Sequence, residues 1–214
     1  MLAACDSSVE AERISPLTPE DLIQHSQEFK KGIISVNDSI HVAIGFSLAN
    51  SIMVEAEGGK IIIDTTGTIE TGREVRSIFD RLNPYPIKAV IYTHNHGDHV
   101  FGAVALAGKS KPDVYAHELT NYYLDRVMTQ IRPVISKRSY RMHGIVLDDD
   151  ALVNCGIGHR LEHGKDAELG LIRPTKTYKD SLRVSISGID LILYYAPGET
   201  DDQTMVWYPE KKIL

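Results

Sequence analysis

The sequence predicts an α/β fold with a mixed sheet, and three observations support this class. Strand-like and helix-like segments alternate through the first half of the chain, as they do in folds whose parallel strands are joined by helices. Antiparallel hairpin signals lie on either side of this alternation. The chain has 214 residues, of which 43% are hydrophobic, and this is enough for one domain with a sizeable core.

The N-terminal part, residues 1–31, reads as a tether followed by a lead-in helix. Its first half is polar, and a helix is predicted over 19–31 because Glu20 and Asp21 place acidic charge in the first turn. The domain proper is expected over 32–214.

The first elements of that domain are hairpins followed by a helix. Gly58-Gly59 is a hairpin signal. A helix is predicted over 68–82, because Ile69, Val75 and Phe79 fall on one face at helical spacing. The strands expected before it cover 33–36, 41–44, 50–55 and 60–64.

The middle of the chain supplies the parallel strands. Residues 87–93 are an apolar run of strand length and predict a central buried strand. Pro133 is expected to interrupt the last helix of this part. The elements expected after the buried strand are a helix over 100–106, a strand over 113–117 and a helix over 118–131.

Residues 146–177 are the least regular part of the chain. Two hairpins are predicted after them, one over 181–195 and one over 204–214, where the last three residues read as a strand that is just beginning.

Charge and composition exclude several classes of protein. Lys and Arg total 23 and Asp and Glu total 29, so the net charge of −6 argues against a nucleic-acid backbone binder. No apolar run approaches the ~20 residues of a membrane-spanning helix. Two cysteines, Cys5 and Cys155, cannot form a disulfide scaffold or a Cys-rich zinc site. Cys155 is expected to be a small packed residue.

Cys5 closes the tetrapeptide Leu-Ala-Ala-Cys, which has two interpretations. It resembles a bacterial lipobox, in which the Cys becomes lipidated, and this predicts a lipid anchor and a location in the bacterial cell envelope or periplasm. The charged and apolar regions that precede such a cleavage site are absent before it. Chance therefore explains these common residues equally well, and the protein would then be soluble.

Four ligand-type side chains follow the buried strand within residues 94–99. Functional groups of α/β proteins gather at the carboxyl ends of parallel strands. His94 and His96 can point the same way from extended backbone, whereas Asp98 and His99 lie on the next turn and can address a second position. Two imidazoles with a further oxygen or nitrogen ligand suit zinc, so the segment predicts a metal site.

At these residues the sequence resembles the metallo-β-lactamase superfamily, whose signature is His-x-His-x-Asp-His. Residues 61–67 are similar to the apolar strand and Asp turn before that signature, and residues 196–200 to the later loop that carries the third ligand. That ligand is His in most of the superfamily and Glu199 here, which is similar to the alkyl sulfatase branch. The resemblance implies an αβ/βα sandwich with mixed sheets, of which this chain is a C-terminally truncated part.

The resemblance also implies a site for two Zn²⁺ ions. The ligands it implies are His94, His96 and Glu199 for the first zinc, and Asp98 and His99 for the second. Asp98 is also assigned a catalytic role. Asp64 is expected to brace the ligand loop by hydrogen bonding, the alternative being a plain turn residue. The family's bridging acid and last His cannot be placed on this chain, which is therefore expected to be incomplete and poorly active alone.

The function implied is hydrolysis of alkyl sulfate esters to an alcohol and sulfate by a metal-bound hydroxide. The expected partner is a small sulfate ester, and the complete enzyme is expected to be a homodimer. Two alternatives stay open: another hydrolase of this fold, acting on a lactam, lactone, thioester or phosphoester, and an inactive fragment that binds metal.

Five further histidines have no ligand spacing and are expected to be core or surface residues. They are His41, His117, His143, His159 and His163. A guanidinium suits a sulfate, so four arginines are candidates for contact with the substrate. For each of them, a role as a solvated surface charge is the simpler interpretation. These arginines are Arg138, Arg141, Arg160 and Arg173.

Overall fold

The computed structural model describes residues 19–148, 151–158, 160–162 and 167–214. The tetrapeptide that ends at Cys5 and the tether after it lie outside the described residues, as do His159 and His163. Among the described residues, no helix has both the length and the apolar character needed to cross a membrane.

The larger sheet has seven strands in sequence order, so each strand pairs with the next one along the chain. The first four strands are antiparallel and the last four, with β4 shared, are parallel, as expected for a mixed sheet. Its strands are β1 (Gly32–Asn37), β2 (Ile40–Ile44), β3 (Ser51–Ala56), β4 (Gly59–Ile63), β5 (Ile87–Ile91), β6 (Asp113–His117) and β7 (Lys176–Tyr178).

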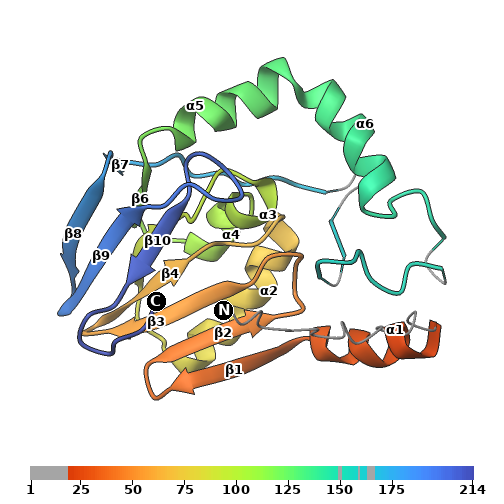
Figure 1. Ribbon diagram of the computed structural model, residues 1–214. Coiled ribbons are helices and arrows are strands. Elements are labelled where there is room, and N and C mark those ends of the chain that lie inside the picture. Colours follow the sequence, from red (N-terminus) through yellow and green to blue (C-terminus); the bar gives the residue numbers. More distant parts are fainter. Residues whose placement is uncertain (1–18, 149–150, 159, 163–166) are drawn as a thin grey trace, which may run out of the picture.

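Helices cover one face of this sheet (Figure 1). The longest of them, α2 (Ile69–Leu82), begins at Thr68, whose side chain and that of Thr71 form a reciprocal capping box. Two short helices, α3 (Gly97–Val100) and α4 (Ala103–Ala107), follow β5. Their buried side chains form one core with α2 and the sheet, and this core holds the segment after β5 in place.

The opposite face of the sheet packs against a second, smaller sheet. Its antiparallel strands are β8 (Ser181–Ile186), β9 (Ile189–Tyr195) and β10 (Thr204–Trp207), in the order β10-β9-β8. Apolar side chains from both sheets, among them Ile61, Ile91, Leu191 and Leu193, fill the space between them. The described chain is therefore layered as helices, a mixed sheet and an antiparallel sheet.

The approach of α2 to the turn before α4 depends on two glycines. A side chain at Gly72 would collide with the carbonyl of Gly102, and one at Gly102 would collide with the carbonyl of Thr65. The backbones meet directly at these points, and the Gly102 amide donates to the Thr66 carbonyl at 2.9 Å. This contact brings the segment after β4 close to the segment after β5.

Two helix predictions were wrong in detail. The predicted helix 100–106 is two short helices, because Gly102 separates them. The lead-in helix is α1 (Pro19–His25), followed by a 3-10 turn (Ser26–Phe29). The helix predicted over 118–131 is present as α5 (Thr120–Asp125) and a π-helical turn (Arg126–Gln130), and a further helix, α6 (Arg132–Met142), was not predicted.

The helical run ends with its C-cap at Ile131, as predicted from Pro133, and Pro133 lies in the first turn of the next helix, α6. A proline there costs nothing, since the first amides of a helix have no intrahelical acceptor. Helix α6 projects away from the sheets in Figure 1, and none of its residues is buried.

Candidate metal centre

The candidate ligands lie where three segments meet at one edge of the larger sheet. Residues 94–99 follow β5, and Asp64 follows the neighbouring parallel strand β4. The third segment, residues 196–203, connects β9 to β10. The Thr204 amide donates to the Thr93 carbonyl at 2.7 Å, which joins the start of β10 to the chain just before His94.

His94, His96 and Glu199 converge on one point. One potential ligand atom from each of them lies within 4.8 Å of the other two. Glu199 Oε1 is 3.1 Å from His96 Nδ1, and Glu199 Oε2 is 3.8 Å from His94 Nε2. Two imidazoles and one carboxylate are the donor set of many catalytic zinc sites. The residues predicted for the first metal are therefore together in space.

His94 carries an observation that favours a bound ion. Its side chain is 4% exposed, and its Nε2 is buried without a hydrogen-bond partner among the described residues. Its Nδ1 lies 3.0 Å from the hydroxyl of Thr93, which can fix the ring orientation. Burial lowers the pKa of His94, and the neighbouring His99 and His96 lower it further. A neutral imidazole with a free nitrogen is the form that binds a metal.

The residues predicted for the second metal have a different environment. His99 Nδ1 is 2.7 Å from Asp64 Oδ2, and His99 Nε2 is 3.4 Å from Asp98 Oδ2. Burial would lower the pKa of His99. The charge and hydrogen bond of Asp64, together with the charge of Asp98, outweigh this effect and raise the pKa to about 9. Asp98 and His99 are adjacent here, but among the described residues only His94, His96 and Glu199 form a group of three donors.

Asp64 has contacts that suit a bracing role. Its buried carboxylate accepts hydrogen bonds from the Thr93 amide at 2.8 Å, the Thr93 hydroxyl at 2.7 Å and His99 Nδ1 at 2.7 Å. Its backbone has a φ of 58°, a conformation that Asp and Asn tolerate better than most residues. Asp64 is thus both a turn residue and a link between the segments after β4 and β5.

Glu162 also lies beside the candidate centre, and no sequence pattern predicts this. A Cβ placed on Gly67 would be 2.9 Å from Glu162 Oε2 and 3.4 Å from Asp98 Cα. Both carboxylate oxygens of Glu162 are buried. Burial raises the pKa of this carboxyl and the charge of Asp98 adds to the rise, while hydrogen bonding to Ser47 and Leu48 opposes it. Glu162 belongs to the irregular segment, where spacing predicts nothing.

The described histidines without ligand spacing are in the core or away from the centre. His41 is buried between Ser35 and Glu55, with ring nitrogens 2.9 Å and 3.2 Å from their side-chain oxygens. His117 stacks on Tyr195 and lies 2.8 Å from the Lys179 carbonyl. His143 lies in the turn that ends α6, and its Nδ1 is buried without a partner within the described ranges.

Arg138, Arg141, Arg173 and Cys155 lie outside the three converging segments. Arg138 and Arg141 lie on the exposed surface of α6, and Arg173 pairs with Asp125 at 2.5 Å. Cys155 is partly buried, with its thiol 3.4 Å from the Gly158 carbonyl.

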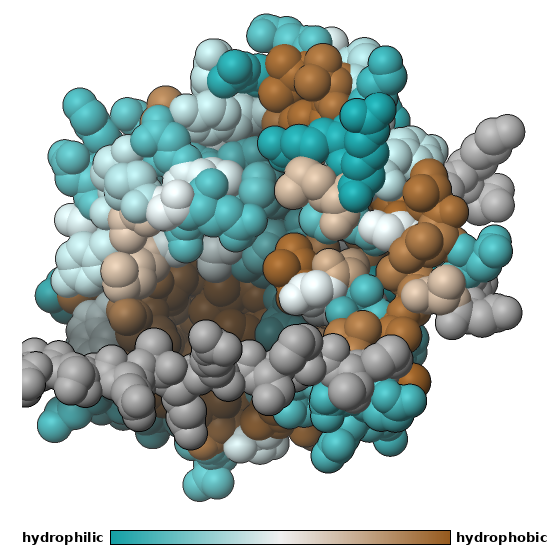
Figure 2. Space-filling view, turned by 45° about the vertical axis from the view of Figure 1, so that its right-hand side comes forward, coloured by the Kyte–Doolittle hydropathy of each residue, from teal (hydrophilic) through white to brown (hydrophobic). Residues whose placement is uncertain are grey.

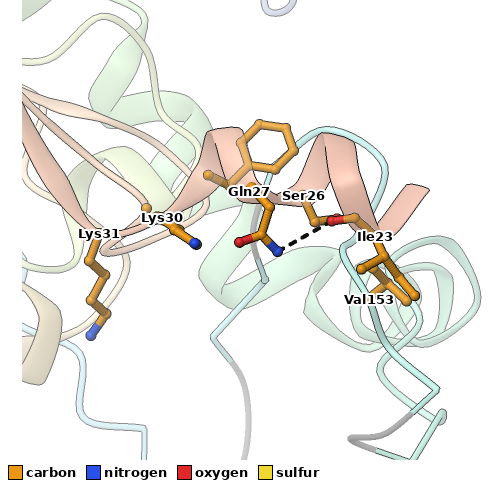
Figure 3. Close-up of a pocket in the computed structure, with 8 residues that line it drawn as sticks. Ile23, Ser26, Gln27, Lys30, Lys31 and Val153 are labelled. Atoms are coloured by element: carbon orange, nitrogen blue, oxygen red, sulfur yellow. Dashed lines mark hydrogen bonds between the residues drawn. The ribbon is translucent and has the colours of Figure 1, made fainter. Parts of the chain in front are cut away.

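A pocket of about 380 Å³ lies elsewhere, between α1 with its 3-10 turn and Gly45 (Figure 3). Ile23, Phe29, Lys31 and Val153 are among its lining residues, none of which is a His, Cys, Asp or Glu. This pocket therefore has no donors for the predicted metal chemistry.

Known proteins are similar to this chain in sequence and in fold. The profile of the metallo-beta-lactamase superfamily matches residues 44–214. A linear primary-alkylsulfatase of Pseudomonas sp. (strain ATCC 19151) is 32% identical over 76% of this chain and 31% of its own length. The alkyl/aryl-sulfatase BDS1 of Saccharomyces cerevisiae is 28% identical over 86% of this chain and 29% of its own length.

Among solved structures, the inverting sec-alkylsulfatase Pisa1 from Pseudomonas sp. superposes with a TM-score of 0.78. The match has 22% identity and covers 88% of this chain and 31% of that one. The chain thus spans about a third of the length of these relatives. The predicted fold class, a mixed α/β sandwich of this type, is confirmed.

Proposed function

Because the chain belongs to the metallo-beta-lactamase superfamily, we propose that it forms part of the active site of a zinc-dependent hydrolase that cleaves alkyl sulfate esters to an alcohol and sulfate. The convergence of His94, His96 and Glu199 carries this proposal. Glu in place of the usual third His is similar to the alkyl sulfatase branch, and the relatives named above are alkylsulfatases.

The donor set fits zinc. His94 and His96 would supply two neutral nitrogen ligands and Glu199 one anionic oxygen, while Asp98 and His99 would contribute to a second ion. When bound, zinc lowers the pKa of coordinated water to ~7 and polarises an ester oxygen. A sulfate ester is anionic, so the positive charge of bound zinc would attract it.

The chain's own residues hold this arrangement in place. Asp64 fixes the ring of His99 through Nδ1, and Thr93 links Asp64 to His94.

Apolar side chains on and after α6 are exposed and could contact an alkyl chain. They are Val134, Tyr140, Met142, Val146 and Leu147. Figure 2 shows apolar patches and a hollow with an apolar floor among polar side chains on one face.

The test is hydrolysis by the zinc-loaded protein, expressed from its full natural reading frame. We expect sulfate release from dodecyl sulfate, no turnover of a chromogenic cephalosporin, and loss of activity in Glu199→Ala. His25→Ala, which changes an exposed histidine of α1, serves as the matched control. Cephalosporin turnover without sulfate release would favour another hydrolase of the fold. Metal binding with neither activity would favour a metal-binding fragment.

The location and assembly of the protein are further parts of the proposal. We propose that Cys5 carries a lipid anchor that holds the protein in the bacterial cell envelope, and that the complete enzyme is a homodimer. Radioactive palmitate should label the full-length protein, and Cys5→Ala should remove the label. Light scattering of the complete enzyme should give twice the mass of one chain.

A further inference from the structure

The loop that carries Glu199 contains a second acid with the opposite exposure. Asp202 is fully buried, whereas the side chain of Glu199 is 62% exposed. Asp202 Oδ1 accepts a hydrogen bond from the Asn95 amide group at 2.6 Å and another from the Thr200 hydroxyl at 2.7 Å. A buried carboxylate is costly unless donors compensate its charge. Asp202 Oδ2 has no hydrogen-bond partner among the described residues, so the two contacts of Oδ1 hold this carboxylate and the loop around it.

Asn95 is the residue between the two histidine ligands. It is buried, and its side chain points to Asp202 across 107 positions of sequence. The hydrogen bond therefore joins the His94–His96 segment directly to the Glu199 segment. Glu199 itself is held in the loop through its backbone amide, which donates to Gln203 Oε1 at 2.7 Å.

We propose that Asn95 and Asp202 are positioning residues that set the distance between Glu199 and the two histidines before metal binds. This inference rests on the metal site of the proposed function. Without the pair, the exposed Glu199 would sample many positions, and ordering it would weaken metal binding. Hydrogen-bonding partners behind metal ligands typically contribute ~10–100-fold to metal affinity.

The neighbouring Asp201 provides a contrast within the same loop. Its exposed carboxylate accepts hydrogen bonds from the hydroxyls of Tyr123 and Tyr195, both at 2.9 Å. These contacts lie at the surface and do not reach the histidine segment. An amide oxygen can replace one carboxylate oxygen as acceptor, so Asp201→Asn is a matched control that should bind metal almost as the wild type does.

The experiment exchanges the two partners. Asn95→Asp places two carboxylates together, and we expect Co²⁺ affinity at the first position to fall ~10–100-fold. Asp202→Asn leaves two amide groups that can still form a weaker hydrogen bond, so Co²⁺ affinity should fall less than in Asn95→Asp. The double variant restores one amide and one carboxylate with reversed roles, and should return to within about threefold of the wild type. Co²⁺ is titrated into the metal-free protein and followed by its visible absorption, which reports the ligand set.

A second measurement needs no metal. Hydrogen exchange of residues 196–203 in the metal-free protein should speed up in Asn95→Asp and return to the wild-type rate in the double variant. A double variant that is folded by circular dichroism yet matches Asn95→Asp in both measurements would overturn the inference. If Glu199→Ala binds Co²⁺ as tightly as the wild type does, Glu199 is not a metal ligand and the proposed function fails at that point. The hydrogen-exchange measurement, which needs no metal, then tests by itself whether Asn95 and Asp202 position the loop.

Discussion

The two halves of the candidate centre differ in how their donors are occupied. In the first half, His94 Nε2 has no hydrogen-bond partner within the described residues and Glu199 is largely exposed. In the second half, His99 lies between Asp64 and Asp98, and its pKa is raised to about 9, mainly by Asp64 against the opposing effect of burial. The first set therefore leaves a buried donor nitrogen without a hydrogen bond, whereas the ring nitrogens of His99 in the second set both face carboxylates. We therefore expect the two positions to respond separately to substitution.

The largest expected effect breaks the first half. His94→Ala removes the buried nitrogen and leaves two ligands, fewer than the three of catalytic zinc sites. Zinc affinity at the first position should fall by more than ~100-fold, beyond the loss typical of indirect partners. Isothermal titration of zinc into the metal-free protein measures this. His25→Ala is the control, and equal affinities in the two variants would contradict the assignment.

The next effect should be confined to the second half. Asp64→Asn removes a charge that holds His99, and it keeps the backbone because Asn also tolerates the φ of 58°. The second zinc should bind ~10–100-fold more weakly while the first changes little. Two-site titration separates the two events, with the exposed turn residue Asp38→Asn as control. A loss at the first site alone would show that the halves are assigned the wrong way round.

The sequence could predict the parts of the centre that are close along the chain. His94, His96, Asp98 and His99 occupy six consecutive positions after a buried strand, so local spacing was enough. Glu199 came only from the resemblance, because nothing in its local pattern points to residue 94. Asn95 and Glu162 were missed. One is a neutral residue without ligand chemistry, and the other lies in a segment without periodicity.

Much of the fold was predictable because strands and turns also depend on residues that are close along the chain. Most of the strands follow from short apolar runs and turn residues, and the mixed sheet was confirmed. Strand β7 was not predicted, because it lies at the end of the irregular segment. Helix boundaries were predicted less well. A proline can end one helix or begin the next, and the choice at Pro133 depends on how the chain turns before it.

A smaller effect should reach both halves at once. The Thr93 hydroxyl donates to Asp64 and lies 3.0 Å from His94 Nδ1, so Thr93→Val removes one contact from each half at nearly constant volume. One hydrogen bond contributes ~0.5–1.5 kcal/mol, so each affinity should fall about two- to tenfold. Titration of zinc into Thr93→Val and into the exposed-site control Thr177→Val provides the comparison. A change at one position only would show that Thr93 serves that half alone.

The smallest expected effect concerns Glu162 and tests whether the second half extends to the irregular segment. Glu162→Gln keeps the shape of the side chain and removes a carboxylate that lies beside Asp98. A nearby carboxylate favours a cation, and partial solvent screening limits the gain, so the second zinc should bind about two- to fivefold more weakly. The first should be unchanged, because Glu162 does not belong to the cluster of His94, His96 and Glu199. Glu168→Gln alters an exposed residue of the same segment and is the control. Tighter binding of the second zinc in Glu162→Gln would contradict this expectation. It would mean that the carboxylate of Glu162 competes with the metal for space near Asp98, and that Glu162 helps to keep the second position free of metal.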